Sequence, residues 1–268
     1  MKKLYLLDID GTISLDATLF EGSLDFLNWV NETGGKYIFI TNNSTTSIAE
    51  YVKKFSKMGV KVDETNFLTS SFVMGRYLKE HFSKNKIFVV GTKSFIKELK
   101  ELKLDIVTDL QEFKEISCAV VGFDNELNFE KVTDICRLLE QKDIPYVATN
   151  PDYACPTSFG FVPDCGAICE FISHATKKMP IYIGKPAPTM VELSRKTYGY
   201  TKEETIVVGD RLYTDIACGI AADVDTAVVF TGEAKEEDMK TTEFVPTYCC
   251  QDIREFHEKM KALSGHGM

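Results

Sequence analysis

The stretch LYLLDIDGT, residues 4–12, decides the fold class, because an apolar run of strand length ends abruptly in two acids and a glycine. Alternation along a strand puts Asp8 and Asp10 on the same side, at the carboxyl end where open α/β sheets bind ligands. Gly11 allows the chain to turn sharply after the strand. A charged strand end before a turn is the simpler interpretation of this motif, so it needs support from the rest of the chain.

Apolar runs of strand length alternate with segments of helical spacing along most of the sequence. The strands expected for a main sheet cover residues 4–9, 37–40, 67–68, 181–183, 206–208 and 227–230. Runs of β-branched and aromatic residues separated by helices are typical of a parallel sheet covered on both faces. The sequence therefore predicts an α/β fold with a Rossmann-like parallel sheet.

The middle of the chain repeats this alternation as a separable block. Residues 84–178 are enough for a small domain, and lysine-rich polar sequence (SKNK, ATKK) stands at both ends. We therefore expect residues 1–83 and 179–268 to form the Rossmann-like core, with residues 84–178 inserted as a smaller α/β cap.

Charge and composition exclude several classes of protein. The chain has 268 residues, with 31 Lys and Arg against 40 Asp and Glu, so its net charge of −9 argues against nucleic acid or an anionic membrane surface as partner. No apolar run approaches the ~18 residues of a membrane span, and Asp8 interrupts the N-terminal run before it could serve as a signal peptide. We expect a cytoplasmic protein whose eight cysteines are reduced and form neither disulfides nor a zinc site.

Three further motifs each follow one of the expected strands. They are Thr41-Asn42-Asn43, Gly184-Lys185-Pro186 and the segment GDRLYTD at residues 209–215. Each is ordinary alone: an N-cap cluster, a loop lysine and an acidic cap of the next helix. At one sheet edge they make a phosphoryl-transfer set, in which Asp8 is the nucleophile, Asp10 the general acid and base, and Asp210 a ligand for Mg²⁺. Donors for the phosphoryl oxygens come from Thr41, Asn42 and Lys185.

These motifs resemble those of the haloacid dehalogenase superfamily of aspartate-nucleophile hydrolases. DIDGT, TNN, GKP and GDRLYTD are similar to its four motifs and occur in the same order. An α/β cap between the second and third motifs, with the segment ATNPDYACPTSFGFVPDCGAIC, resembles the p-nitrophenylphosphatase-like (NagD-type) branch. The likeness covers nearly the whole chain.

The resemblance implies a mechanism and a set of roles. Asp8 attacks phosphorus and forms an aspartyl-phosphate, while Asp10 protonates the leaving oxygen and later activates water. The Asp8 carboxylate, the Asp10 backbone carbonyl and Asp210 would hold Mg²⁺, with Asp215 orienting one of its waters. The phosphoryl group would bind to Thr41, the Asn42 backbone and Lys185, and Asn43 would help to hold the loop. Paired caps in this kind of protein also imply a homodimer.

The substrate is less well defined by the sequence. The cap residues expected to face the leaving group are Asn150, Asp152, Tyr153, Cys155 and Asp164. The alternative is that Asn-Pro-Asp and Pro-Asp-Cys-Gly only form turns. A polar, acidic cap fits small phosphorylated metabolites such as nucleoside monophosphates, sugar phosphates or pyridoxal phosphate, with p-nitrophenyl phosphate as a test substrate.

Two other functions stay open at this point. In a phosphotransferase or phosphomutase of the same superfamily, a sugar hydroxyl replaces water as the acceptor. A non-catalytic protein would keep the fold and bind a phosphorylated metabolite without turnover, although it would have no need of Asp8, Asp10, Lys185 and Asp210 together.

Overall fold

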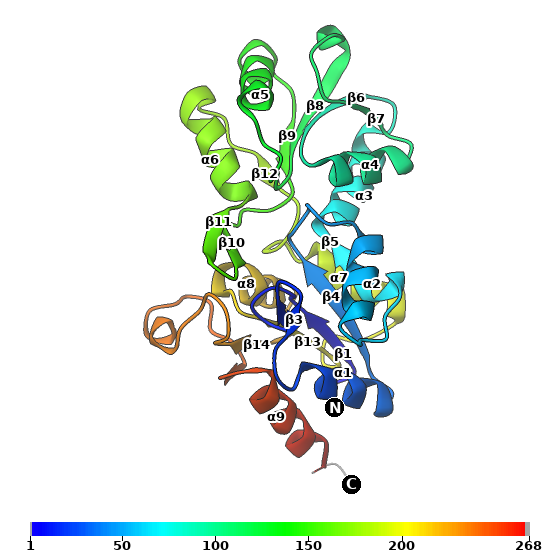
Figure 1. The fold of residues 1–268 in the computed structure, drawn as a ribbon, viewed down its shortest axis with the longest axis vertical. Coiled ribbons are helices and arrows are strands. Elements are labelled where there is room, and N and C mark those ends of the chain that lie inside the picture. Colours follow the sequence, from blue (N-terminus) through cyan, green and yellow to red (C-terminus); the bar gives the residue numbers. More distant parts are fainter. Residues whose placement is uncertain (1, 266–268) are drawn as a thin grey trace.

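The first of two parallel sheets forms the body of the structure, a computed structural model that describes residues 2–265 (Figure 1). Its strand order is β15-β14-β13-β1-β4-β5, and every neighbouring pair is parallel. The strands are β1 (Leu4–Leu7), β4 (Lys36–Thr41), β5 (Phe67–Thr69), β13 (Thr205–Gly209), β14 (Asp225–Val229) and β15 (Tyr248–Cys250). This sheet and the helices on both of its faces are called the core.

Apolar residues on alternate positions of the core strands pack against helices on opposite faces. The helices of one face are α1 (Ser23–Glu32), α2 (Ile48–Lys57) and α9 (Ile253–Gly265). Those of the other are α3 (Ser70–Phe82), α7 (Thr189–Tyr198) and α8 (Ala217–Ala221). The predicted α/β architecture is confirmed by this parallel, doubly covered sheet.

The second sheet has the order β12-β9-β8-β6-β7 and is also parallel. Its strands are β6 (Lys86–Val90), β7 (Asp105–Val107), β8 (Ile116–Val121), β9 (Tyr146–Ala148) and β12 (Ile181–Tyr182). Its helices are α4 (Lys93–Glu101) on one face and α5 (Phe129–Gln141) and α6 (Cys165–Thr176) on the other. Residues 86–182, called the inserted unit below, lie at the opposite end of the molecule from the two chain termini (Figure 1).

One strand belongs to a different sheet from the one expected. The segment 181–183 was predicted as a core strand, but β12 pairs with β9 at the edge of the second sheet. A two-residue strand carries too little pattern to indicate its partner, so only the contact with β9 reveals its sheet.

Short elements complete the described chain. Two antiparallel hairpins are β2 (Ser14–Leu15) with β3 (Thr18–Leu19) and β10 (Ala154–Thr157) with β11 (Gly160–Pro163). Single helical turns are η1 (Glu64–Asn66), η2 (Phe113–Glu115), η3 (Leu212–Ile216) and η4 (Glu236–Lys240). No helix within residues 2–265 combines the length and apolar character needed to cross a membrane.

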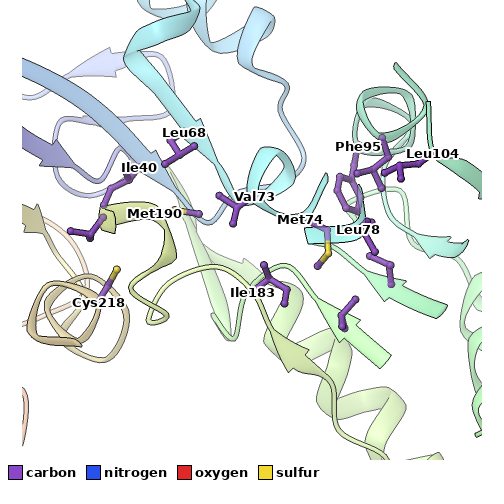
Figure 2. Close-up of a cluster of buried hydrophobic side chains, with 14 of the residues drawn as sticks. Ile40, Leu68, Val73, Met74, Leu78, Phe95, Leu104, Ile183, Met190 and Cys218 are labelled. Carbon is purple, nitrogen blue, oxygen red and sulfur yellow. The ribbon is translucent and has the colours of Figure 1, made fainter. Parts of the chain in front are cut away.

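The two sheets share a continuous apolar cluster (Figure 2). Helix α3 lies between them, so that Val73 packs on the core side and Met74 and Leu78 extend toward the inserted unit, where Phe95 of α4 joins the same cluster. This buried connection fixes the inserted unit above the core, near the carboxyl ends of the core strands.

The strand order places the first motif at the centre of the core. After β1 the chain adds β4 and β5 on one side and later adds β13, β14 and β15 on the other. The carboxyl ends of β1 and β13 are therefore a topological switch point, where loops diverge and ligands bind in open α/β sheets.

Candidate active site

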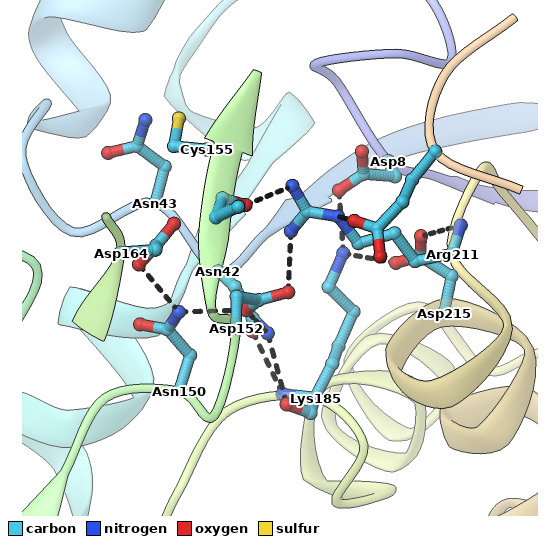
Figure 3. A network of polar contacts seen from close by, with 12 residues as sticks. Asp8, Asn42, Asn43, Asn150, Asp152, Cys155, Asp164, Lys185, Arg211 and Asp215 are labelled. Atoms are coloured by element: carbon cyan, nitrogen blue, oxygen red, sulfur yellow. Dashed lines mark hydrogen bonds and ion pairs between the residues drawn. The ribbon is translucent and has the colours of Figure 1, made fainter. Parts of the chain in front are cut away.

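Asp8 and Lys185 form the centre of a buried polar network (Figure 3). Asp8 follows β1, and its Oδ1 accepts a hydrogen bond of 2.6 Å from Lys185 Nζ. The same ammonium group donates to Asp215 Oδ1 at 2.6 Å and to the Ile40 carbonyl at 2.9 Å. Since an ammonium group has three protons, every donor of Lys185 is in use. Burial opposes its charged form, but Asp215 and Asp8 raise the pKa of Lys185 above the usual value.

Three carboxylates meet at the switch point. Oxygens of Asp8, Asp210 and Asp215 all lie within 4.8 Å of one another. Burial raises the pKa of each of these carboxyls to about 6, even though Lys185 lowers those of Asp8 and Asp215 and Arg211 lowers that of Asp210. Buried carboxylates in excess of their cationic partners are a hard oxygen donor set that suits Mg²⁺.

Asp210 is held in place by close packing. Its Oδ1 accepts from Thr12 Oγ1 at 3.3 Å, and its Oδ2 accepts from the Glu233 backbone N–H at 2.8 Å. A Cβ at Gly11 or Gly232 would collide with the Asp210 carboxylate. Gly11 also has a φ of +96°, which glycine adopts without steric cost. The glycine of DIDGT therefore allows both the turn and the close approach of Asp210.

Asp10 lies in the same cavity but outside the carboxylate cluster. Burial raises the pKa of Asp10, and the nearby ammonium of Lys54 lowers it again. Lys54 Nζ is 3.7 Å from Asp10 Oδ1 and comes from helix α2. A carboxyl whose pKa is raised above its ordinary value is better suited to donate a proton as a general acid. Lys54 is a site residue that the sequence analysis missed, because no local pattern distinguishes it from the other lysines of its helix.

The TNN motif lines the cavity, and its side chains also hold the surrounding loops together. Thr41 Oγ1 accepts from the Asn43 backbone N–H at 3.1 Å. Asn43 Oδ1 accepts from the backbone N–H and hydroxyl of Thr45, at 2.9 and 2.7 Å, within the loop that follows β4. The side chain of Asn42 bonds to the backbone of Lys185 at both N–H (2.9 Å) and carbonyl (3.0 Å), which ties the second motif to the third.

Two of the five predicted cap residues border the cavity. Cys155 and Asp164 lie on its wall, near Asn43 (Figure 3). Burial, with the charge of Asp152 as a second cause, raises the pKa of Asp164 to about 7. Its Oδ1 accepts from Asn150 Nδ2 at 3.0 Å and from the backbone N–H of Cys165 at the start of α6.

The other three were expected to face the leaving group, and the structure places them elsewhere. Tyr153 is about half exposed, and its hydroxyl donates to Glu170 on the outside of α6. Asn150 is fully buried, with its amide bonded to Thr149, Asp152 and Asp164. Asp152 is also buried and faces the core rather than the cavity. Turn-forming sequences such as Asn-Pro-Asp do not reveal which polar side chain points inward.

Arg211 is the second residue that the sequence analysis missed. It follows Asp210, and its guanidinium contacts Asp152 Oδ1 at 2.5 Å, the Ala154 carbonyl at 2.7 Å and Glu233 Oε2 at 2.9 Å. The position of Arg211 next to a predicted metal ligand could have indicated a role in the site. Its partner Asp152, however, is 59 residues away in the sequence, so the contact itself could not be predicted.

The cavity at this site is small. It measures about 20 Å³, room for roughly one water molecule. Its walls are formed by Asp8, Asp10, Thr41, Asn42, Asn43, Cys155, Pro156, Asp164, Lys185 and Arg211. Because three of these residues belong to the inserted unit, that unit closes the site from above.

Comparison with known proteins agrees with this arrangement. The family described as haloacid dehalogenase-like hydrolase matches residues 5–105, and a related hydrolase-like family matches residues 182–256. An acid sugar phosphatase of Staphylococcus epidermidis is 30% identical over 249 residues, 93% of this chain and 94% of that protein.

Solved structures show the same likeness. The 4-nitrophenylphosphatase of Thermotoga maritima has a TM-score of 0.88 and 34% identity, covering 96% of this chain and 97% of that one. A glycerol phosphate phosphatase of Mycobacterium tuberculosis, solved in complex with magnesium, has a TM-score of 0.88 and 25% identity, covering 96% of this chain and 77% of that one.

A carboxylate cluster at the switch point of a parallel sheet, closed by a second α/β unit, defines a hydrolase of the phosphatase class. The chain belongs to the haloacid dehalogenase-like hydrolases, in their p-nitrophenylphosphatase-like (NagD-type) branch. The resemblance drawn from the four motifs is thereby confirmed.

Proposed function

We propose that this phosphatase is a Mg²⁺-dependent phosphomonoesterase that acts on small phosphorylated metabolites through an aspartyl-phosphate on Asp8. The observation that carries the proposal is the pairing of Asp8 with Lys185 at 2.6 Å, inside a closed cavity that also contains Asp10. Lys185 holds one carboxylate oxygen, which leaves the other free to attack phosphorus.

The residues of the chain divide the reaction between them. Asp8 attacks phosphorus as the bond to the leaving oxygen breaks, and Asp10 donates its proton to that oxygen. Water then attacks the phosphorus of the aspartyl-phosphate, Asp10 takes its proton, and the Asp8 carboxylate is regenerated with release of phosphate. Burial favours the protonated form of Asp10 that the first step needs.

Mg²⁺ fits the cluster of Asp8, Asp210 and Asp215. The carboxylates of Asp8 and Asp210 and the Asp10 backbone carbonyl would hold it, with Asp215 orienting one of its waters. When bound, it offsets the charge of the phosphoryl oxygens and of the carboxylates. The magnesium complex of the mycobacterial phosphatase supports this assignment.

The phosphoryl group is expected to bind at Thr41, the Asn42 backbone and Lys185. All three protons of Lys185 are already bonded, so it reaches a phosphoryl oxygen only by giving up one of those acceptors. The main effect of Lys185 is therefore to hold Asp8 and balance its charge.

Sugar phosphates are the substrate class best supported for this chain. The relative from Staphylococcus epidermidis is an acid sugar phosphatase. The side chains of Asn43 and Asp164 border the cavity and offer polar groups to a hydroxylated leaving group. Nucleoside monophosphates and p-nitrophenyl phosphate complete the range of substrates to be tested.

The test is phosphate release from sugar phosphates, nucleoside monophosphates and p-nitrophenyl phosphate, with Mg²⁺ and with chelator. We expect metal-dependent release by the native chain and none by Asp8→Asn. Asp223→Asn is the matched control, because Asp223 is an exposed partner of Lys202 and its φ of +56° suits asparagine. Acid-quenched samples of the native chain should carry one phosphoryl group on the peptide that contains Asp8.

Three results would contradict the proposal. Near-native release by Asp8→Asn would remove Asp8 as the nucleophile. Transfer of the phosphoryl group to a sugar hydroxyl, without free phosphate, would show a phosphotransferase or mutase, and binding without any turnover by folded protein would show a binding protein.

A further inference from the structure

Asp152 connects the inserted unit to the core through both of its carboxylate oxygens. Its Oδ1 is 2.5 Å from Arg211 Nη1, and its Oδ2 accepts from Asn42 Nδ2 at 2.6 Å (Figure 3). Asn150, from its own unit, also donates to Oδ2 at 2.7 Å. Only 1% of Asp152 is exposed. A carboxylate so deeply buried is tolerated because three donors, one of them charged, surround it.

Both core partners of Asp152 hold parts of the active site. The amide of Asn42 bonds to the backbone of Lys185 on both sides, and Lys185 in turn holds Asp8 and Asp215. The backbone N–H of Arg211 donates to Asp215 Oδ2 at 3.1 Å. Asp152 is therefore linked to Lys185 through Asn42, and to Asp215 through Arg211.

A phosphate ester does not fit the cavity in the arrangement in which Asp152 contacts the core. The cavity holds roughly one water, and a phosphate ester is several times larger. Cys155 and Pro156, which close the cavity, belong to the same segment as Asp152, so this segment must withdraw to admit the ester. Glu233 belongs to the core and is a second partner of Arg211, so it would keep the guanidinium partly paired when that segment withdraws.

We propose that Asp152 is a positioning residue. Its contacts with the core hold the active-site residues in place when the inserted unit is closed on the core. When the unit closes, Asp152 fixes Asn42 and Arg211, and these side chains fix Lys185 and the loop of residues 210–215. This inference rests on the proposed function for its catalytic consequence, because a displacement of about 1 Å in a phosphoryl-transfer site costs on the order of 10²-fold in rate.

Asp152→Asn is the sharpest perturbation of this contact. Asparagine has the same shape but only one acceptor oxygen to meet the donors of Arg211, Asn42 and Asn150. We expect kcat/KM to fall on the order of 10²-fold, and by the same factor on every substrate that the native chain hydrolyses. Glu170→Gln is the matched control: Glu170 bonds Tyr153 within the inserted unit and touches neither the core nor the cavity.

Hydrogen–deuterium exchange supplies a measurement that does not depend on turnover. In Asp152→Asn, peptides covering residues 41–45 and 209–216 should exchange faster than in the native chain, whereas Glu170→Gln should leave them unchanged. If the native chain released no phosphate from any substrate, the proposed function would fail, and the exchange of these two core segments would still decide the role of Asp152.

Arg211→Lys tests the same contact from the core side. It also provides a second test if Asp152→Asn does not fold. The double variant should be no slower than the slower of the two single variants, since both remove one coupled contact. Three results would overturn the proposal: native kcat/KM in Asp152→Asn or in Arg211→Lys, unchanged exchange of the two core segments in either variant, or losses that multiply in the double variant.

Discussion

Replacing Lys185 by methionine tests how much the site depends on one buried cation. Lys185 is 1% exposed, and Lys185→Met keeps most of the volume of its stem. The change leaves the carboxylates of Asp8 and Asp215 and the carbonyl of Ile40 without their shared donor. Removing one partner of a buried ion pair costs about 3–5 kcal/mol. Since domains are stable by only about 5–15 kcal/mol, the variant should be near its unfolding threshold at neutral pH.

The loss of stability should depend on pH. In the native chain the pKa values of Asp8 and Asp215 are about 6, above the ordinary value of 3.8, so the folded state binds more protons than the unfolded state between pH 4 and 6. Stability contributed by these groups therefore decreases as the pH rises through that window. Without Lys185 the two pKa values rise further, and the decrease extends to higher pH. Lys185 itself stays charged throughout, because its folded pKa is raised.

Urea unfolding followed by circular dichroism at pH 5, 7 and 8.5, with chelator present, measures this effect. The difference between the native chain and Lys185→Met should be largest at pH 8.5 and smallest at pH 5. Lys202→Met is the control, because the Lys202–Asp223 pair is exposed and its loss should not change the midpoint measurably. A variant as stable as the native chain at pH 8.5, or a loss that is the same at every pH, would refute the reasoning.

Three further predictions concern the chemistry and the packing. Asp10→Asn should slow both formation and hydrolysis of the phosphoenzyme, which rapid-quench kinetics resolves; an unchanged rate for both steps would exclude acid–base catalysis by Asp10. Asp164→Asn should change the ranking of sugar phosphates while activity on p-nitrophenyl phosphate is retained, and equal losses on all substrates would indicate a purely structural role. Gly232→Ala should raise the Mg²⁺ concentration needed for half-maximal activity, because the new Cβ collides with the Asp210 carboxylate. An unchanged metal titration would show that the loop containing residue 232 shifts without displacing Asp210.

The core of the site could be predicted because parallel strands bring sequence-distant residues together. Asp8 follows β1 and Asp210 follows β13, and these strands are neighbours in register, with Leu7 opposite Val208. Any polar residue just past both strands must lie at the same edge, whatever the rest of the sequence does. Lys185 also reaches this edge, although β12 before it belongs to the other sheet.

The residues of the inserted unit could not be placed in the same way. The segment 150–164 contains a hairpin with Pro156, Gly160 and Pro163, and no alternation of apolar and polar residues shows which side faces the core. Tyr153 and Asp152 are adjacent, yet one is exposed beside Glu170 and the other is buried against Arg211. Their different burial is determined by tertiary packing, which cannot be predicted from the spacing of residues in the sequence.

The balance of charge at the site favours the binding of a cation together with a phosphate ester. The inserted unit places Asp164 on the wall of the cavity and pairs Asp152 with Arg211. The core supplies Asp8, Asp10 and the two further carboxylates of the cluster, against the cations Lys185 and Lys54. An anionic ester entering this pocket raises the excess of negative charge, and the ammonium of Lys185 has no spare proton to offer it. A divalent cation among Asp8, Asp210 and Asp215 reduces that excess without displacing Lys185. We therefore expect a phosphate ester to bind at a lower electrostatic cost when the cation is in place.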